Sequence, residues 1–200
     1  IGTNSDRALL LDFQATLETK PEKAIKLEKD ALAQIETITA DNARLVSNLH
    51  ANLGGLYRMN GHPDLAREHM EKSISLLDQF NLLHINDSIP QIANYAMFLT
   101  EQQEPERGIS ELQKLSGIIK EYHSDDCLDY AKVQETLGTI YLMTANLPQA
   151  KTHFKRAFKI YEKIWADEPE MIEAKYQEIQ ELYPQIGFCI GKNLSGLLTK

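Results

Sequence analysis

The chain has 200 residues, of which 42% are hydrophobic and 25% are charged, and its formal net charge is −8 at pH 7. The composition is that of an ordinary folded protein. The negative charge argues against a nucleic-acid partner, because such binding depends on Lys and Arg that neutralise phosphates. No apolar run approaches the ~20 residues that cross a bilayer, and no signal-peptide pattern opens the chain. We therefore expect no membrane association and a cytoplasmic location. The chain begins at Ile1 rather than Met, so we expect it to be part of a longer protein.

Apolar spacing at i, i+3, i+4 and i+7 predicts helices along the whole chain and no strand. In chain order, the predicted helices span residues 5–18, 21–39, 42–59, 63–80, 85–102, 105–122, 126–145, 148–165 and 169–183. The segment 185–200 is the least regular part, and we expect one short terminal helix there that covers the last hairpin.

A repeat of 42 residues runs through these helices. Small residues recur at this interval, at Ala24, Ala66, Gly108 and Ala150. Prolines follow nearly the same interval, at Pro21, Pro63, Pro105 and Pro148. A fixed period in the range of about 20–50 residues is typical of a stacked repeat architecture. The sequence therefore predicts a single all-α domain over 1–200, with repeats at about 5–46, 47–88, 89–130 and 131–168 and a C-terminal capping helix and tail at 169–200.

Each repeat is predicted to be an antiparallel helical hairpin. Proline fits the first turn of a helix, where its missing N–H costs nothing, so each proline is expected to open the second helix of a pair. Asn60-Gly61-His62-Pro63 is typical of a helix end, a turn and a new helix start. Small residues at the Gly54 and Ala66 positions are expected to let the two helix axes approach closely.

Two hairpins resemble the tetratricopeptide repeat. The signature of that repeat is similar to Leu137-Gly138-x-x-Tyr141 followed by Ala150-x-x-x-Phe154-x-x-Ala157. It is nearly as similar to Leu53-Gly54-x-x-Tyr57 followed by Ala66-x-x-x-Met70. The usual unit has about 34 residues. The longer unit here resembles kinesin light chain and related bacterial arrays, including peptide-sensing regulators. This resemblance implies a right-handed superhelix, an α-solenoid, whose first helices line a concave groove for a peptide.

The residues expected to line that groove lie on the first helix of each hairpin. Asn52 and Asn94 occupy the position where kinesin-light-chain-like repeats commonly carry Asn, and an amide can pair with a peptide main chain through both donors and acceptors. The alternative is that these amides bond to the backbone of a neighbouring helix. The other predicted peptide-binding residues are Asn48, Arg58, Met97, Glu101, Lys132, Glu135 and Thr139.

Catalytic and metal-binding patterns are not found. The six histidines show no metal-ligand grouping, and no phosphate loop or nucleophile elbow occurs. Lys151, Lys155, Lys159 and Lys163 are interpreted as a solvated outer face. The expected function is therefore a non-catalytic scaffold, without cofactor or metal, that binds a protein or peptide segment in the groove. The alternatives are self-association through an edge or the convex face and, more remotely, the sensor domain of a peptide-responsive bacterial regulator.

Overall fold

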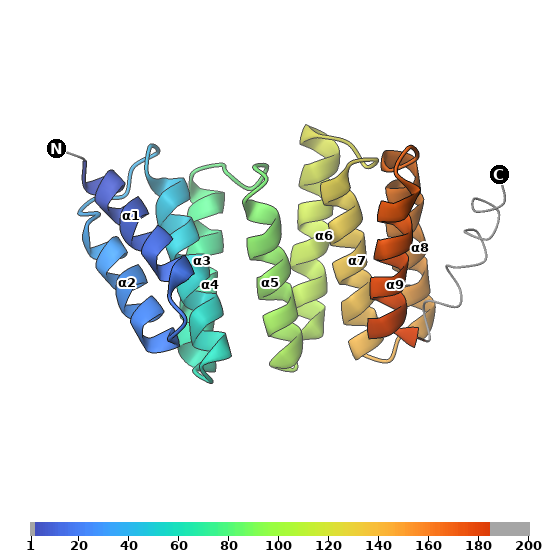
Figure 1. The fold of residues 1–200 in the computed structure, drawn as a ribbon, viewed down its shortest axis with the longest axis horizontal. Coiled ribbons are helices and arrows are strands. Elements are labelled where there is room, and N and C mark those ends of the chain that lie inside the picture. The colour runs from blue at the N-terminus through green and yellow to red at the C-terminus, as the bar shows by residue number, and fades with distance from the viewer. Residues whose placement is uncertain (1–2, 185–200) are drawn as a thin grey trace. The chain divides into compact units, whose positions relative to one another are not determined.

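In a computed structural model, which describes residues 3–184, the chain is all-helical (Figure 1). The helices of this range are α1 (Asn4–Leu17), α2 (Pro21–Ala33), α3 (Ala43–Met59), α4 (Pro63–Gln79), α5 (Ser88–Glu101), α6 (Pro105–Tyr122), α7 (Leu128–Met143), α8 (Leu147–Ile164) and α9 (Pro169–Leu182). They follow one another as antiparallel pairs, which confirms the predicted all-α hairpin array. The terminal helix predicted in 185–200 lies outside the described residues.

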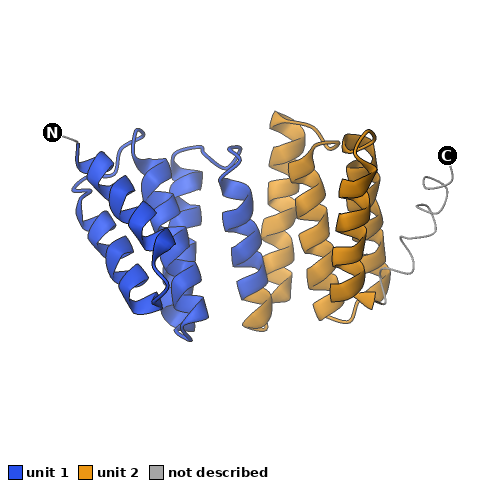
Figure 2. Ribbon diagram, in the orientation of Figure 1, with its two compact units in different colours: residues 1–98 blue, residues 99–200 orange. Residues whose placement is uncertain are grey.

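The chain forms two compact units, Ile1–Phe98 and Leu99–Lys200 (Figure 2). In the first unit, α1 packs on α2, α2 on α3, and α3 on α4. In the second, α6 packs on α7 and α7 on α8. Each unit therefore buries its core between consecutive helices, as a stacked repeat does.

Second helices begin with proline in its first turn, as predicted, at Pro21, Pro63, Pro105 and Pro148. The turn before three of them contains one residue in the left-handed region, at 42-residue intervals: Gly61 with φ 74°, Gln103 with φ 66° and Ala145 with φ 60°. Two of these three residues carry a Cβ, which costs about 1–2 kcal/mol in this conformation. The hairpin turn is therefore a property of the repeat and is kept where glycine is missing.

The close approach of paired helices depends on glycines, as predicted. A Cβ on Gly54 would lie 2.6 Å from Met70 Cγ and 3.3 Å from the carbonyl oxygen of Ala66 on α4. In the fourth repeat, a Cβ on Gly138 would lie 2.9 Å from the ring of Phe154. Each glycine therefore leaves the space that a large residue of the second helix fills.

Two adjacent glycines of α3 are expected to respond to alanine in opposite directions. Gly54→Ala should lower the free energy of unfolding by about 1–2 kcal/mol, because the cost of overpacking against α4 exceeds the gain in helix propensity. Gly55→Ala should raise it by about 0.5–1 kcal/mol, since an added Cβ there meets nothing within 4 Å. Urea denaturation of both variants tests this, and equal shifts would contradict close packing at Gly54.

One helix is shorter than predicted. The second helix was expected over 21–39, but α2 ends at Ala33. Thr37, Ile38 and Thr39 form a β-branched run, which disfavours helix. In addition, the Asn42 amide closes a local loop: its Nδ2 donates to the carbonyl oxygen of Thr37 at 2.9 Å, and its Oδ1 accepts from the Thr39 N–H at 2.8 Å.

The third hairpin also begins later than expected, at Ser88 instead of residue 85. The Ser88 hydroxyl lies 2.6 Å from the carbonyl oxygen of Leu83 and 2.7 Å from that of Ile85. The left-handed Asn81, with φ 55°, follows the end of α4. The Ser88 hydroxyl thus provides a partner for the carbonyl oxygens of Leu83 and Ile85, which lie outside a helix.

Candidate functional site

Corresponding faces of the first helices form one stripe of exposed and half-buried residues per repeat, which we call the first-helix face. On α1 the stripe carries Leu10, Phe13 and Leu17, on α3 it carries Asn48, Asn52 and Met59, and on α5 it carries Asn94 and Met97. These residues belong to the first unit, and α7 has the corresponding stripe in the second unit.

Asn52 is held inside the first unit by two carboxyl groups. Its Nδ2 donates to Asp12 Oδ1 at 2.9 Å and to Glu28 Oε1 at 3.1 Å. Glu28 is 1% exposed, and its second oxygen has no hydrogen-bond partner. Burial, together with the charge of Asp12, raises the pKa of Glu28 to about 8, whereas the bond from Asn52 acts in the opposite direction. The Asn52 amide is therefore engaged with side chains of α1 and α2.

Asn94 occupies the same repeat position but has a different environment. The residues equivalent to Asp12 and Glu28 in the preceding hairpin are Gly54 and Met70, whose side chains offer no oxygen acceptor. Asn94 is exposed, and within residues 3–184 its side chain forms no hydrogen bond. Its donors and acceptor are therefore available to a partner.

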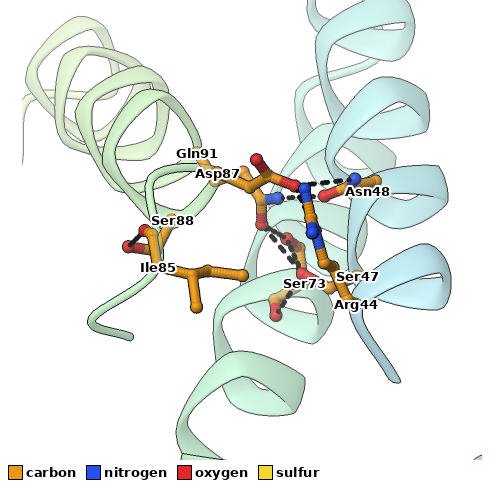
Figure 3. Close-up of polar contacts among 8 residues, drawn as sticks. All are labelled: Arg44, Ser47, Asn48, Ser73, Ile85, Asp87, Ser88 and Gln91. Carbon is orange, nitrogen blue, oxygen red and sulfur yellow. Dashed lines mark hydrogen bonds and ion pairs between the residues drawn. The ribbon is translucent and has the colours of Figure 1, made fainter. Parts of the chain in front are cut away.

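Asn48 belongs to a polar network between α3, α4 and the start of α5 (Figure 3). Gln91 Nε2 donates to Asn48 Oδ1 at 2.6 Å, and Asn48 Nδ2 donates to Asp87 Oδ2 at 3.3 Å. The hydroxyls of Ser47 and Ser73 both lie within hydrogen-bond distance of Gln91 Oε1, at 2.8 and 2.5 Å. The network therefore ties the second hairpin to α5.

An ion pair closes this network at its outer side. Arg44 Nε lies 2.6 Å from Asp87 Oδ2. The hydrogen bond from Arg44 lowers the pKa of Asp87, and the bond from Asn48 acts in the same direction. Asp87 therefore stays charged well into acid.

Sequence reasoning missed Ser47, Ser73 and Gln91, although each stands in a repeat position that is apolar in other repeats.

The remaining predicted residues of the first unit are Arg58 and Met97. Both are half-buried, Arg58 near the end of α3 and Met97 one turn beyond Asn94 on α5. Asn94 and Met97 therefore present an amide and a thioether side by side, at i and i+3 of one helix.

In the second unit, Glu135 and Thr139 are bonded within the fold. Glu135 accepts from the Tyr161 hydroxyl at 2.6 Å and pairs with Lys175 Nζ at 2.8 Å. Burial alone would lower the pKa of Lys175, but the bonds and charges of Glu135 and Glu178 raise it. The Thr139 hydroxyl donates to the backbone carbonyl oxygen of Glu135 at 3.1 Å.

Glu101 and Lys132 are the exposed members of the predicted set in the second unit. Lys132 lies 3.8 Å from Asp129, one turn earlier on α7. An ion pair of this kind on the surface contributes little to stability, so Lys132 can leave Asp129 and pair with a carboxylate of a partner.

Four exposed apolar side chains on the first-helix face were not among the predicted binding residues. Leu10 is 58%, Phe13 60%, Leu17 67% and Met59 82% exposed. Leu10 occupies the repeat position of Asn52 and Asn94, and Phe13 and Leu17 follow it at i+3 and i+7 on α1. This spacing is the signal that could have identified them, and Met59 occupies the repeat position of Leu17.

Two histidine contacts recur at equivalent positions of the second and fourth repeats. His50 Nδ1 lies 2.9 Å from His69 Nδ1, and His153 Nδ1 lies 2.9 Å from Gln134 Oε1. Among the described residues, no group of three or more His, Cys, Asp or Glu is suited to hold a metal ion. In the same part of the chain, no helix has the length and apolar character that would let it span a bilayer.

Comparison with known proteins identifies the repeat. Residues 88–163 match the sequence profile of the tetratricopeptide repeat, and no curated protein sequence matches the chain. The fold is similar to that of BtubC (BKLC) from P. vanneervenii, with a TM-score of 0.73 and 18% identity over 95% of this chain and 78% of that chain. It is also similar to a Podosopora anserina protein with nearly identical TPR-like repeats, described as a kinesin light chain. There the TM-score is 0.63 at 14% identity, over 73% of this chain and 69% of that one. Residues 88–163 therefore match the tetratricopeptide repeat, a class that generally serves as a protein-interaction scaffold, and the described chain has the fold of a TPR-like repeat array.

Proposed function

We propose that the chain is a non-catalytic scaffold that binds a segment of a partner protein on its first-helix face. The observation that supports this most is the exposure, at 58 to 82%, of Leu10, Phe13 and Leu17 along α1 and of Met59 on α3, which occupies the repeat position of Leu17. Clustered large apolar side chains on a surface are typical of protein-interaction sites. The partner segment is expected to present apolar side chains to this face.

The predicted polar residues then orient the segment. The side-chain amide of Asn94 forms hydrogen bonds with the main chain of the bound segment, and Met97 forms an adaptable apolar contact with it. Asn48 and Asn52 act chiefly by holding the helices that carry the face. Arg58 in the first unit, and Glu101, Lys132, Glu135 and Thr139 in the second, are proposed as further contacts within their own units.

Two equivalent asparagines are expected to behave differently when changed to alanine. Asn94→Ala should leave the melting temperature unchanged and weaken partner binding by about 3–10-fold, the value of one hydrogen bond. Asn52→Ala should lower the melting temperature, because it leaves Asp12 and buried Glu28 without their shared donor. Thermal denaturation and titration with a bound peptide measure the two effects. A stability loss in Asn94→Ala would show that this residue is structural.

Peptides for this test can be selected from a displayed random library. Binding of the selected peptides should fall at least tenfold in a Phe13→Ser, Met59→Ser double variant, since each lost apolar contact is worth about 1.5–3 kcal/mol. The matched control is Leu65→Ser, which changes an exposed apolar residue on α4, a second helix. Peptides that are sensitive to Leu65→Ser and insensitive to the double variant would exclude the first-helix face as the site.

Self-association through the same exposed side chains is the second candidate. Light scattering distinguishes it, because groove-type binding predicts a mass that is independent of concentration. A mass that rises with concentration in the wild type and not in the Phe13→Ser, Met59→Ser variant would favour assembly.

A further inference from the structure

A positively charged hollow lies on the second unit. Its volume is about 660 Å³, and it is lined by the second half of α8, the end of α6, the start of α7 and the α6–α7 connection. Five of its nine lining residues are basic: Lys120, Lys155, Arg156, Lys159 and Lys163. Two are acidic, Asp125 and Asp126. The hollow is thus net positive on a chain of net charge −8.

Among residues 3–184, two of the five basic residues form neither an ion pair nor a side-chain hydrogen bond. Lys120 lies 3.7 Å from Asp125, and Lys163 pairs with Asp126. Arg156 donates to Gln134 Oε1 at 3.4 Å. Lys155 and Lys159 are both exposed, and within the described part of the chain neither forms an ion pair or a side-chain hydrogen bond. These two ammonium groups therefore remain available for an anion.

The repeat itself does not require these lysines. The position of Lys159 is occupied by Ala33, Ser75 and Gly117 in the other three repeats. The position of Lys155 is Lys29 in the first repeat, Glu71 in the second and Gln113 in the third. Because helical hairpins of the same fold form without a basic residue at these positions, the concentration of positive charge on α8 is not explained by packing.

The spacing of the lysines fits carboxylates on an extended chain. Lys155, Lys159 and Lys163 are each four residues apart on α8, which places them about 6 Å apart along the helix axis. Alternate side chains of an extended peptide are about 6.5 Å apart and point the same way. A segment with acidic residues at every second position can therefore meet successive lysines.

We propose that this hollow binds an acidic segment of a partner protein, with Lys155 and Lys159 paired to its carboxylates. Tyr130 is buried and lines the hollow, and Lys120 Nζ lies 5.2 Å from its ring centre, which positions a third cation in the hollow. Nucleic acid is disfavoured, because its affinity depends on neutralising many phosphates and the rest of the chain is acidic. This proposal is independent of binding on the first-helix face.

Fluorescence anisotropy with a labelled peptide of alternating glutamate and serine tests the proposal. Wild-type protein should bind the peptide at low salt and release it as salt rises. Lys155→Glu, Lys159→Glu should weaken binding about tenfold or more, since two attractions become repulsions. The matched control, Lys23→Glu, Lys26→Glu, makes the same change of net charge on exposed lysines of α2 and should alter binding less than twofold. Circular dichroism checks that both variants remain folded.

Three results would overturn the proposal. Absence of peptide binding by the folded wild type is the first, and an equal loss in the α2 control, which would indicate a bulk charge effect, is the second. The third is tighter binding of a short single-stranded DNA than of the peptide, which would assign the hollow to phosphates. None of these bears on the Phe13→Ser, Met59→Ser test, so the two proposals fail separately.

Discussion

Glu28→Gln is expected to stabilise the protein by about 2–4 kcal/mol above pH 8 and to have little effect below pH 4.5. The folded-state pKa of about 8 lies above the ordinary value of 4.5. Between these values the unfolded chain gives up its proton while the folded protein keeps it, so the wild type loses stability as pH rises. Gln cannot ionise, and its amide can replace the carboxylic acid beside Asp12 and Asn52. The variant should therefore lack this loss.

Urea denaturation across this pH range measures the effect as a difference between two curves. The free energies of unfolding of wild type and Glu28→Gln, plotted against pH, should coincide in acid, diverge from about pH 4.5 and differ by a constant amount above pH 8. Glu36→Gln is the matched control, because Glu36 is an exposed carboxylate in the connection after α2 and should leave the curve unchanged. Parallel curves for wild type and Glu28→Gln would show that Glu28 ionises normally in the folded protein.

The buried acid also shows what a repeat pattern can and cannot predict. The pattern predicted the hairpins and the proline starts, because these recur in every unit, and the close helix contacts at Gly54 and Gly138, where two of the four units carry glycine. It did not identify the end of α2 at Ala33, which depends on the side chain of Asn42 nine residues further on. Nor did it identify the left-handed Gln103 and Ala145, since neither is glycine.

The binding residues were harder to predict for the same reason. Asn52 and Asn94 share a repeat position, yet only Asn52 meets acceptors, because Asp12 and Glu28 replace the Gly and the large apolar residue of other hairpins. The environment of a residue on the first-helix face is thus set by the preceding hairpin as well as by the hairpin that contains the residue. Comparing positions 40 and 24 residues upstream would have separated the two asparagines.

His50→Gln is expected to remove a loss of stability in acid. A proton on one Nδ1 must face a lone pair on the other for His50 and His69 to stay 2.9 Å apart, so the pair is stable only while at least one ring is neutral. Burial lowers the pKa of His50 to about 4, and the charges of His69 and Lys72 act in the same direction. Burial also lowers the pKa of His69, with Lys29 assisting and Glu68 opposing.

These lowered pKa values fix the sign of the effect. The stabilising contribution is present above the ordinary histidine pKa of 6.5 and is lost as pH falls toward 4. The fourth repeat already contains the alternative, since Gln134 Oε1 accepts from His153 whether or not that ring is charged. His50→Gln reproduces this arrangement and should be more stable than wild type by about 1–2 kcal/mol near the low end of the range, after allowance for partial exposure.

Urea denaturation and NMR titration of the His69 ring measure the change. In His50→Gln the acid loss should shrink and the pKa of His69 should rise, because a charged His69 ring can donate to the amide oxygen that replaces the facing ring. The reciprocal change, Gln134→His, should increase the acid sensitivity of the second unit, where burial and the charge of Arg156 already lower the pKa of His153. If His50→Gln and wild type lose stability in parallel between pH 6.5 and 4, the histidine pair is not the origin of the acid response.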